Sequence, residues 1–131
     1  MKEKIELKIN LPVPVPTLFN AWLNSKEHSA FTGGKAKISN KLNSKYTTWD
    51  GYISGLTLEI EENKRILQTW RSSDFKNEDE DSLLELKFKA NSNGGTTLTL
   101  IHTNIPEGEG ENYKKGWKDF YFTPMKEYFK D

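Results

Sequence analysis

Residues 112–128 of the chain read NYKKGWKDFYFTPMKEY. Large apolar side chains recur in this stretch at steps of three, four and one, which is the spacing of one broad face of a helix. They are Tyr113, Trp117, Phe120, Tyr121, Met125 and Tyr128. Pro124 lacks a backbone N–H, so we expect a bend about two thirds of the way along this helix. An aromatic stripe this broad needs a sheet to cover it.

The residues ahead of this tail supply such a sheet. Between Ile5 and Ile9, apolar and charged residues alternate, as in a strand with one buried face. Residues 35–103 continue with short alternating runs separated by turn residues, which is typical of an antiparallel meander. Asp50-Gly51 predicts a tight hairpin turn. Gly55 lies within the next strand, where an isolated glycine marks a bulge or a close backbone approach, so we expect a curved sheet.

Two short helices are predicted between the first strand and the meander. Prolines at every second position of residues 12–16 end the strand, and a helical face follows in Leu18, Phe19, Trp22 and Leu23. Asn24 and Glu27 have the spacing of a capping box, so a second helix begins there and ends near Gly33. The order of elements predicts an α+β fold with the helices on one face of the sheet. At 131 residues and 15.1 kDa, we expect residues 1–131 to form one domain.

The composition argues against several classes of function. Nineteen basic and nineteen acidic residues give a formal charge of +0, which disfavours a protein that binds duplex DNA through its phosphates. Rings on the predicted strands, such as Trp49 and Trp70, lack the clustered basic neighbours of a platform for single-stranded nucleic acid. We therefore expect no nucleic-acid partner. The absence of cysteine rules out disulfides and thiolate chemistry.

Targeting and catalytic signals are also missing. Residues 1–6 alternate charged and apolar side chains, so we expect neither a secretory signal nor membrane insertion, and a cytoplasmic location. No metal-ligand spacing joins His28 to His102, and no nucleophile elbow or phosphate-binding glycine loop occurs. We accordingly predict no catalytic residue, no cofactor and no metal.

His102 is the titratable residue that stands out, because it shares the inward face of its strand with Leu98 and Leu100. It is interpreted first as a hydrogen-bonded core histidine. A second interpretation makes it a polar group that orients a ligand in an apolar pocket, and a third makes it a general acid or base. Gln68 shares a face with Trp70, so if buried it needs a partner or water in a cavity.

Charge is unevenly distributed along the chain. Residues 1–70 hold ten basic and seven acidic side chains, whereas residues 71–131 hold nine and twelve. Five of those acidic residues lie in the segment from Asp74 to Asp81. Such a segment is typical of a solvated loop. The alternative is a docking patch for a basic partner, whose binding would weaken with salt.

An ordered set of short segments resembles the activator of heat-shock protein 90 ATPase family, within the START-like, SRPBCC or helix-grip superfamily. The segments are residues 50–55 (DGYISG), 65–71 (RILQTWR), 97–102 (TLTLIH), Pro106, Gly116-Trp117 and residues 124–128 (PMKEY). The similarity extends over nearly the whole chain, and the set as a whole is more specific than any one segment.

The resemblance implies a curved antiparallel sheet wrapped around a long C-terminal helix, with an apolar cavity between them. Superfamily cavities bind lipids, sterols or other apolar molecules, and the namesake domain helps to stimulate the chaperone ATPase in the stress response. The candidate cavity residues are Trp70, Leu98, Leu100, His102, Trp117, Tyr121 and Met125. The hypothesis is a non-enzymatic domain that encloses a small, lipid-like apolar ligand. The alternatives are a module that binds a heat-shock protein 90-type chaperone and, third, a cyclase- or dehydratase-like enzyme that depends on His102.

Overall fold

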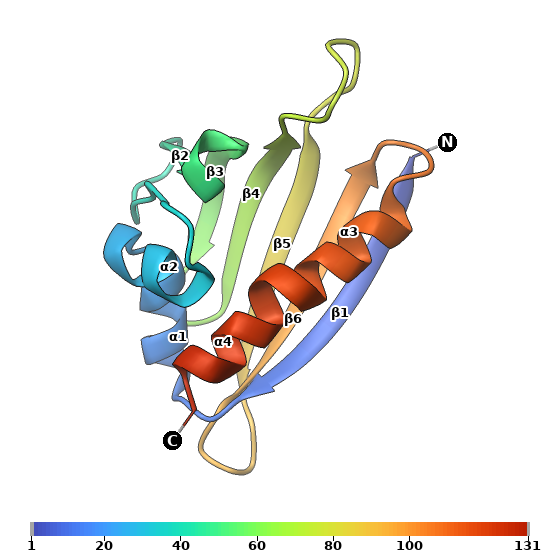
Figure 1. Cartoon of the computed structure of the whole chain (residues 1–131). Coiled ribbons are helices and arrows are strands. Elements are labelled where there is room, and N and C mark those ends of the chain that lie inside the picture. Colours follow the sequence, from blue (N-terminus) through green and yellow to red (C-terminus); the bar gives the residue numbers. More distant parts are fainter. Residues whose placement is uncertain (1, 131) are drawn as a thin grey trace.

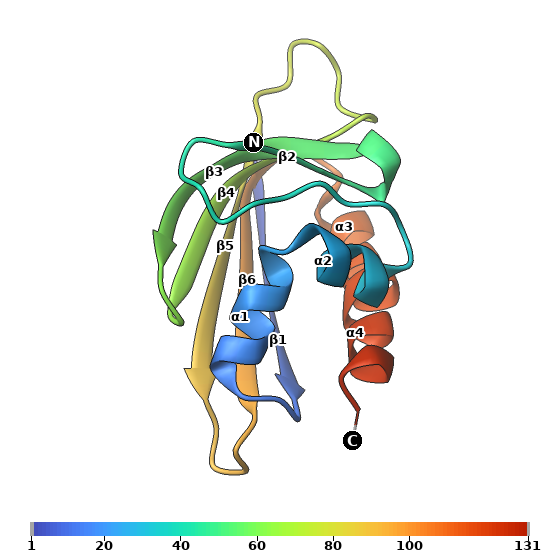
Figure 2. The same cartoon turned by 90° about the vertical axis from the view of Figure 1, so that its left-hand side faces the viewer.

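A single long helix at the C-terminus lies across the concave face of a curved antiparallel sheet (Figure 1), and Figure 2 shows the other helices on the same side. The computed structural model describes residues 2–130. The strands are β1 (Glu3–Leu11), β2 (Lys45–Thr48), β3 (Ile53–Glu61), β4 (Arg65–Ser72), β5 (Ser82–Ala90) and β6 (Thr96–Ile105). This arrangement confirms the predicted α+β helix-grip fold.

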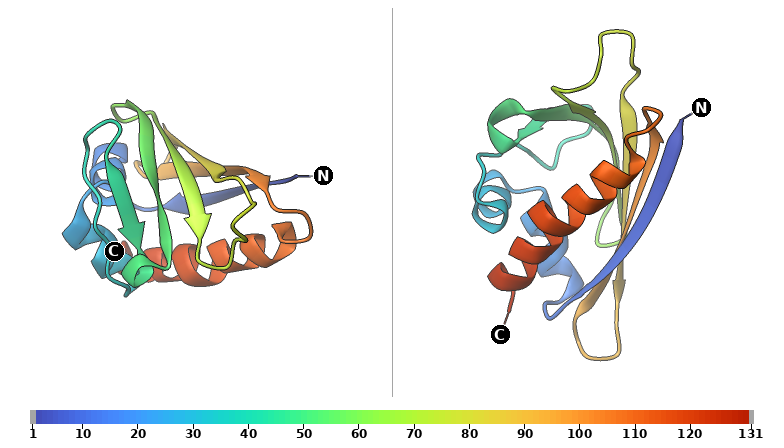
Figure 3. Two further views of the ribbon diagram at one scale, coloured as in Figure 1. Left: turned by 90° about the horizontal axis from the view of Figure 1, so that it is seen from above. Right: turned by 45° about the vertical axis from the view of Figure 1, so that its right-hand side comes forward.

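The strand order is β1-β6-β5-β4-β3-β2, so β1 and β2 form the two edges of the sheet. Figure 3, seen from above, shows the strands curving over the terminal helix. Gly55 accounts for part of this curvature by close approach, because a Cβ at this position would collide with the carbonyl oxygen of Thr69. The register of β3 against β4 slips further along, between Thr57 and Glu59, where β3 bulges.

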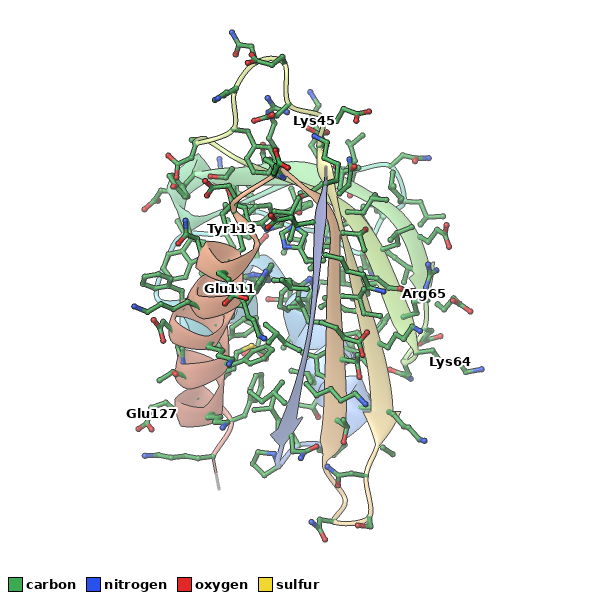
Figure 4. All side chains as sticks on the ribbon, turned by 90° about the vertical axis from the view of Figure 1, so that its right-hand side faces the viewer. Lys45, Lys64, Arg65, Glu111, Tyr113 and Glu127 are labelled. Carbon is green, nitrogen blue, oxygen red and sulfur yellow. The ribbon has the colours of Figure 1, made fainter. Side chains whose placement is uncertain are left out.

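The two faces of the sheet differ in chemistry. On the outer face Arg65 donates to Glu59 at 2.6 Å and also to Glu85. Figure 4 shows Arg65 and Lys64 on the side of the sheet that faces away from the terminal helix. On the inner face, β5 and β6 bury side chains at alternate positions, including His102 as predicted. The inner face is therefore the one that the helices cover.

The two short helices are confirmed where the sequence predicted them. The first, α1 (Val15–Trp22), carries Pro16 in its first turn, and its apolar face is buried. The second, α2 (Ser25–Thr32), is capped by Asn24, whose side-chain oxygen accepts from the backbone N–H of Glu27 at 2.9 Å. Gly33 ends it with φ 84°. Between them, α1 and α2 cover the inner face beside the last turns of the terminal helix (Figure 1).

The terminal helix has three parts: α3 (Gly110–Gly116), the π-helical segment η2 (Trp117–Phe122) and α4 (Thr123–Tyr128). Side chains that are four residues apart are buried along it, namely Trp117, Tyr121, Met125 and Phe129. In an α-helix, a step of four residues rotates the side chain by about 40° more than one full turn around the helix axis. A π turn contains more residues per turn than an α turn, so it offsets this extra rotation and keeps these side chains on one face.

This phase shift corrects the predicted stripe at two positions. Phe120 is 61% exposed and Tyr128 is 41% exposed, although regular spacing placed both on the inner face. A regular 3.6-residue period does not predict an inserted π turn, so it assigns Phe120, within that turn, and Tyr128, after it, to the wrong face, whereas Met125 is buried as predicted. Pro124 follows η2 by two residues, so the helix departs from regular geometry beside the proline. The bend that we expected there stays a prediction.

Gln68 is fully buried, and two protein partners satisfy its amide. Its oxygen accepts from Trp22 Nε1 at 3.3 Å, and its nitrogen donates to Thr57 Oγ1 at 3.0 Å. The amide thus joins α1 to the sheet and needs no water-filled cavity, which answers the question raised by its sequence position. Within residues 2–130, no helix has the length and apolar character required to span a membrane.

Candidate functional site

A pocket of about 660 Å³ lies between the first half of the terminal helix and the end of the sheet formed by β3 and β4. The short 3₁₀ turn η1 (Trp49–Gly51), which connects β2 to β3, forms one wall. The lining residues are Trp49, Tyr52, Ile53, Trp70, Ser72, Asp74, Glu109, Asn112, Tyr113, Gly116, Trp117, Phe120 and Tyr121. Aromatic side chains dominate this list.

The inner wall is a continuous cluster of rings. Trp70, on β4, lies 5.2 Å from Tyr113 and 6.0 Å from Trp117 between ring centroids. Trp117 in turn lies 4.7 Å from Tyr121. Figure 4 shows Tyr113 near the upper end of the terminal helix. Rings held at such distances give a largely apolar surface on which a ligand can pack.

The mouth of the pocket presents apolar groups to solvent. Tyr52 is 46% exposed, and Phe120 is more exposed still. Trp49, which also lines the pocket, has φ 54°, in the left-handed region that bulky residues seldom adopt. Its ring is held 6.0 Å from Phe120 and 6.1 Å from Tyr121. A strained backbone conformation of this kind persists only where neighbouring packing holds it in place. Such conformations cluster at functional sites.

His102 lies behind the inner wall, fully buried on β6. Ser82 Oγ donates to the carbonyl oxygen of Trp70 at 2.6 Å, so its single hydrogen is used. The 2.8 Å contact between Ser82 Oγ and His102 Nε2 is therefore a bond that the histidine donates. Nδ1 of His102 accepts from Trp117 Nε1 at 3.1 Å. The ring is thus a neutral tautomer, and burial lowers its pKa to about 3.

His28 holds the helix in an equivalent way, about one helical turn after Trp117. Its Nδ1 donates to the carbonyl oxygen of Trp22 at 2.8 Å, because that oxygen can only accept. Its Nε2 lies 3.0 Å from the hydroxyl of Tyr121, which donates to it. Burial lowers the pKa of His28 to about 4. The same burial holds the pKa of the Tyr121 phenol well above its usual range.

Three of the seven predicted cavity residues, Trp70, Trp117 and Tyr121, line the pocket. The other four do not contribute to its lining. Leu98, Leu100, Met125 and His102 are fully buried in the core instead. His102 is separated from the pocket by the rings of Trp70 and Trp117, whose centroids lie 4.7 and 5.9 Å from its own.

Most of the mouth residues were missed by sequence reasoning. Tyr113 and Phe120 belonged to the predicted helical stripe without being assigned to the site. Trp49 and Tyr52 flank the Asp50-Gly51 turn, so a usable signal was present. A hairpin turn bordered by two aromatic residues places two rings at one end of a sheet. Within residues 2–130, no three histidine, aspartate or glutamate side chains converge to hold a metal ion.

The acidic segment from Asp74 to Asp81 forms the loop between β4 and β5, which projects from one end of the molecule (Figure 1). Arg71, on β4, holds this loop in place through hydrogen bonds. Its guanidinium donates to the carbonyl oxygens of Asp79 and Lys76 at 2.7 and 2.8 Å. It also pairs with the Asp81 carboxylate at 3.2 Å. The loop therefore has a defined conformation, with Glu78 and Glu80 exposed on it.

The family model described as "Activator of Hsp90 ATPase homolog 1-like protein" matches residues 12–130. The chain belongs to this family. The matched range covers both short helices, five of the six strands and the terminal helix. The resemblance that the sequence segments suggested is therefore confirmed for the family and for its helix-grip fold.

Individual relatives show how similar the chain is to other proteins that carry this description. The chain is 28% identical over 126 residues to the human activator of 90 kDa heat shock protein ATPase homolog 1, covering 96% of this chain and 37% of that protein. A Dictyostelium discoideum homologue is 25% identical over 100 residues, or 76% of this chain and 26% of that one. The chain thus spans about a third of these relatives or less. A Plasmodium falciparum protein described as an HSP90 activator superposes with a TM-score of 0.83 at 27% identity, covering 92% and 91% of the two chains.

Proposed function

We propose that this domain binds a small, largely apolar ligand in the pocket between α3, η2 and the β3–β4 end of the sheet. The observation that carries the proposal is the pocket itself, about 660 Å³ in volume and walled by aromatic side chains. Pockets that bind small molecules commonly measure about 300–1,000 Å³ and combine apolar walls with a few polar groups. Each Å² of apolar surface buried there contributes roughly 25 cal/mol before the costs of association.

The arrangement supports binding rather than catalysis. Both ring nitrogens of His102 are occupied, by Ser82 and Trp117. The ring nitrogens of His28 are likewise occupied, by Trp22 and Tyr121. A histidine that acts as a general base needs a free ring nitrogen within reach of the substrate, and these two histidines instead fix the helix against its neighbours. We therefore propose a non-enzymatic role for the pocket.

Gly116 offers a direct test, because it lines the pocket with regular helical backbone angles. A Cβ at this position would meet only the Phe120 ring, at 4.0 Å. Gly116→Leu should therefore project a branched side chain into the pocket and obstruct it without straining the backbone, and replacing a mid-helix glycine should raise helix stability. Gly116→Ala is the matched control, since it gains helix propensity but leaves most of the pocket open.

The measurement is a thermal-shift and native mass spectrometry screen with a panel of lipid-like and aromatic compounds. We expect compounds that bind the natural chain and Gly116→Ala to lose binding to Gly116→Leu, while all three chains fold. If no compound binds the natural chain, or if binding survives in Gly116→Leu, the proposal fails.

A second candidate is suggested by the family. We propose as an alternative that the domain contacts a heat-shock protein 90-type chaperone, since the human and Plasmodium relatives are named as activators of that protein. The loop from Asp74 to Asp81 is a candidate contact, because Glu78 and Glu80 are exposed on it. Such a contact would be electrostatic and sensitive to salt.

The test is a pull-down and an ATPase assay with the chaperone of the host organism at low ionic strength. We expect association, and a weaker association for the double variant Glu78→Gln, Glu80→Gln. Gly116→Leu serves as the control that leaves this surface intact. No association at low salt would eliminate the chaperone alternative and leave the pocket proposal standing.

A further inference from the structure

The charged residues of the pocket all have the same sign. Asp74 and Glu109 are its charged lining residues, and within residues 2–130 no lysine, arginine or histidine lines it. Asp74 enters from the loop after β4, and Glu109 precedes α3. The two carboxylates thus come from the two structural layers between which the pocket opens. An anionic ligand entering here would be repelled from both sides.

Neither carboxylate is neutralised by the protein. Asp74 accepts from the Tyr52 hydroxyl, and Glu109 accepts from the Asn112 amide at 3.4 Å. Among residues 2–130, neither one has a salt-bridge partner. Arg71 is engaged elsewhere, with the loop carbonyls and Asp81, and lies over the Phe75 ring at 5.5 Å. Two negative charges therefore remain available at the pocket.

The negative charges of the two carboxylates also act on Tyr113 in the pocket wall. The pKa of the Tyr113 phenol is raised to about 12, first by burial and then by the negative charges of Glu109 and Asp74. Tyr113 is also part of the ring cluster, 5.2 Å from Trp70. The same site thus combines aromatic rings, whose faces attract cations, with carboxylates that attract them at longer range.

We infer that the pocket selects an organic cation, an ammonium group attached to an apolar body, over neutral and anionic molecules of similar shape. The ammonium group is placed by Asp74, Glu109 and the rings of Tyr52 and Tyr113. The apolar body packs deeper, against Trp70 and Trp117. This inference rests on the proposed function, because it names the ligand class of the same pocket.

The test compares three probes that share a phenylbutyl group and differ in charge: phenylbutylamine, phenylbutanol and phenylbutyrate. Binding is measured by isothermal titration at neutral pH and low ionic strength. We expect the protonated amine to bind about tenfold more tightly than the alcohol, as a desolvated cation–π contact provides. The carboxylate should bind more weakly than the alcohol. All three should lose binding to Gly116→Leu, which assigns the signal to the pocket.

Charge-removing variants identify the carboxylates responsible. Asp74→Asn and Glu109→Gln should each weaken amine binding about threefold to tenfold and should weaken phenylbutanol binding by a smaller factor, because the alcohol carries no charge. Glu78→Gln on the same loop and Glu111→Gln on the same helix are matched controls, since both residues are exposed and neither lines the pocket. These controls should bind the amine as the natural chain does.

The outcomes separate the two proposals. If phenylbutanol binds and the amine binds no more tightly, or if the control variants lose as much affinity as Asp74→Asn, the cation inference is overturned and the apolar pocket stands. If phenylbutyrate binds most tightly, the inference is also overturned. If none of the three probes binds and the wider compound panel also fails, both proposals fall.

Discussion

The two halves of the terminal helix are held alike but covered differently: the α3 half borders the pocket and is called the open end, and the α4 half packs against α2 and is called the closed end. Where the halves meet, in η2, two buried histidines each accept a hydrogen bond from an aromatic side chain: His28 from the Tyr121 hydroxyl on the closed side and His102 from Trp117 Nε1 on the open side. Around His28, the helices α1 and α2 close over the rings, with Trp22 only 4.6 Å away. Near His102 no such cover is present among the described residues, and the pocket opens instead.

Because of this difference, one end of the helix contributes mainly to stability and the other end mainly to ligand binding. The closed end unites α1, α2, the helix and the sheet through Trp22, whose indole donates to Gln68. The open end keeps its rings at the surface of a pocket, where a ligand can complete their burial. We therefore expect substitutions at the closed end to lower stability and those at the open end to lower affinity.

The largest expected effect is a loss of stability in acid that involves both ends. The folded-state pKa values are about 4 for His28 and about 3 for His102, below the unfolded value of about 6.5. The unfolded chain therefore binds protons first, so the stabilisation is complete above pH 6.5 and is lost as the pH falls toward 4 and then 3. Each histidine accounts for about 3 kcal/mol by pH 4.

Urea unfolding at a series of pH values measures this effect. An unfolding free energy that stays constant between pH 7 and pH 4 would contradict the buried, neutral state of both rings. His28→Gln and His102→Gln, measured relative to their own values at pH 7, should each remove about half of the dependence.

Substituting Trp22 should give the next largest effect. Trp22→Ala removes a buried ring and leaves the Gln68 oxygen without its donor, so we expect a loss of roughly 3–5 kcal/mol in unfolding free energy. Tyr113→Ala at the open end is the matched variant, with an expected loss below about 2 kcal/mol. Tyr113→Ala should lower ligand affinity more than Trp22→Ala does. Equal losses of stability in the two variants would contradict the proposed difference between the closed end and the open end.

A smaller change tests the bond between helix and histidine at the closed end. Tyr121→Phe removes the hydroxyl that donates to His28 Nε2 and leaves a buried nitrogen unpaired, at a cost of about 1–3 kcal/mol. Water or a proton can then reach that nitrogen more easily, so the pKa of His28 should rise. Titration of the ring signals by NMR checks this, and His102 serves as the internal reference. An unchanged His28 pKa would contradict the assigned bond.

The smallest expected effect is that of Thr48→Val, which is compared with the same substitution at a second buried threonine. Thr57 Oγ1 accepts from Gln68, whereas Thr48 Oγ1 forms no well-aligned hydrogen bond within residues 2–130, although it lies close enough to the Tyr121 hydroxyl to lower the pKa of that phenol. Thr57→Val should cost about 1–3 kcal/mol, because the Gln68 amide loses its acceptor. Thr48→Val should be neutral or slightly stabilising. Thermal unfolding of the pair measures the difference, and a larger loss for Thr48→Val would reverse our assignment.

Local signals in the sequence were sufficient for most of the fold. The alternation in β1, the Asn24 cap and the Asp50-Gly51 turn each depend on neighbouring residues, so pattern reasoning recovered them. The inward position of His102 followed from the same alternation. The exposed position of Phe120 did not, because an inserted π turn changes the phase of the helix without a residue pattern that marks it.

The pocket was harder to predict than the fold. Its apolar floor was anticipated through Trp70 and Trp117, which belong to regular elements. Its mouth is built by Trp49 and Asp74 from a turn and a loop, whose placement depends on how far the sheet curves away from the helix. Curvature is a cumulative property of several strands, and one glycine in the sequence can indicate its presence but not its extent.

The four tryptophans permit the most direct test of the claim that binding belongs to the open end. Trp49, Trp70 and Trp117 line the pocket, whereas Trp22 is buried at the closed end. In an NMR titration with phenylbutanol, we predict that the indole N–H signals of the three pocket tryptophans shift and that the Trp22 signal stays in place. A shift of Trp22 equal to the others, or no shift in any of the four, would contradict the account.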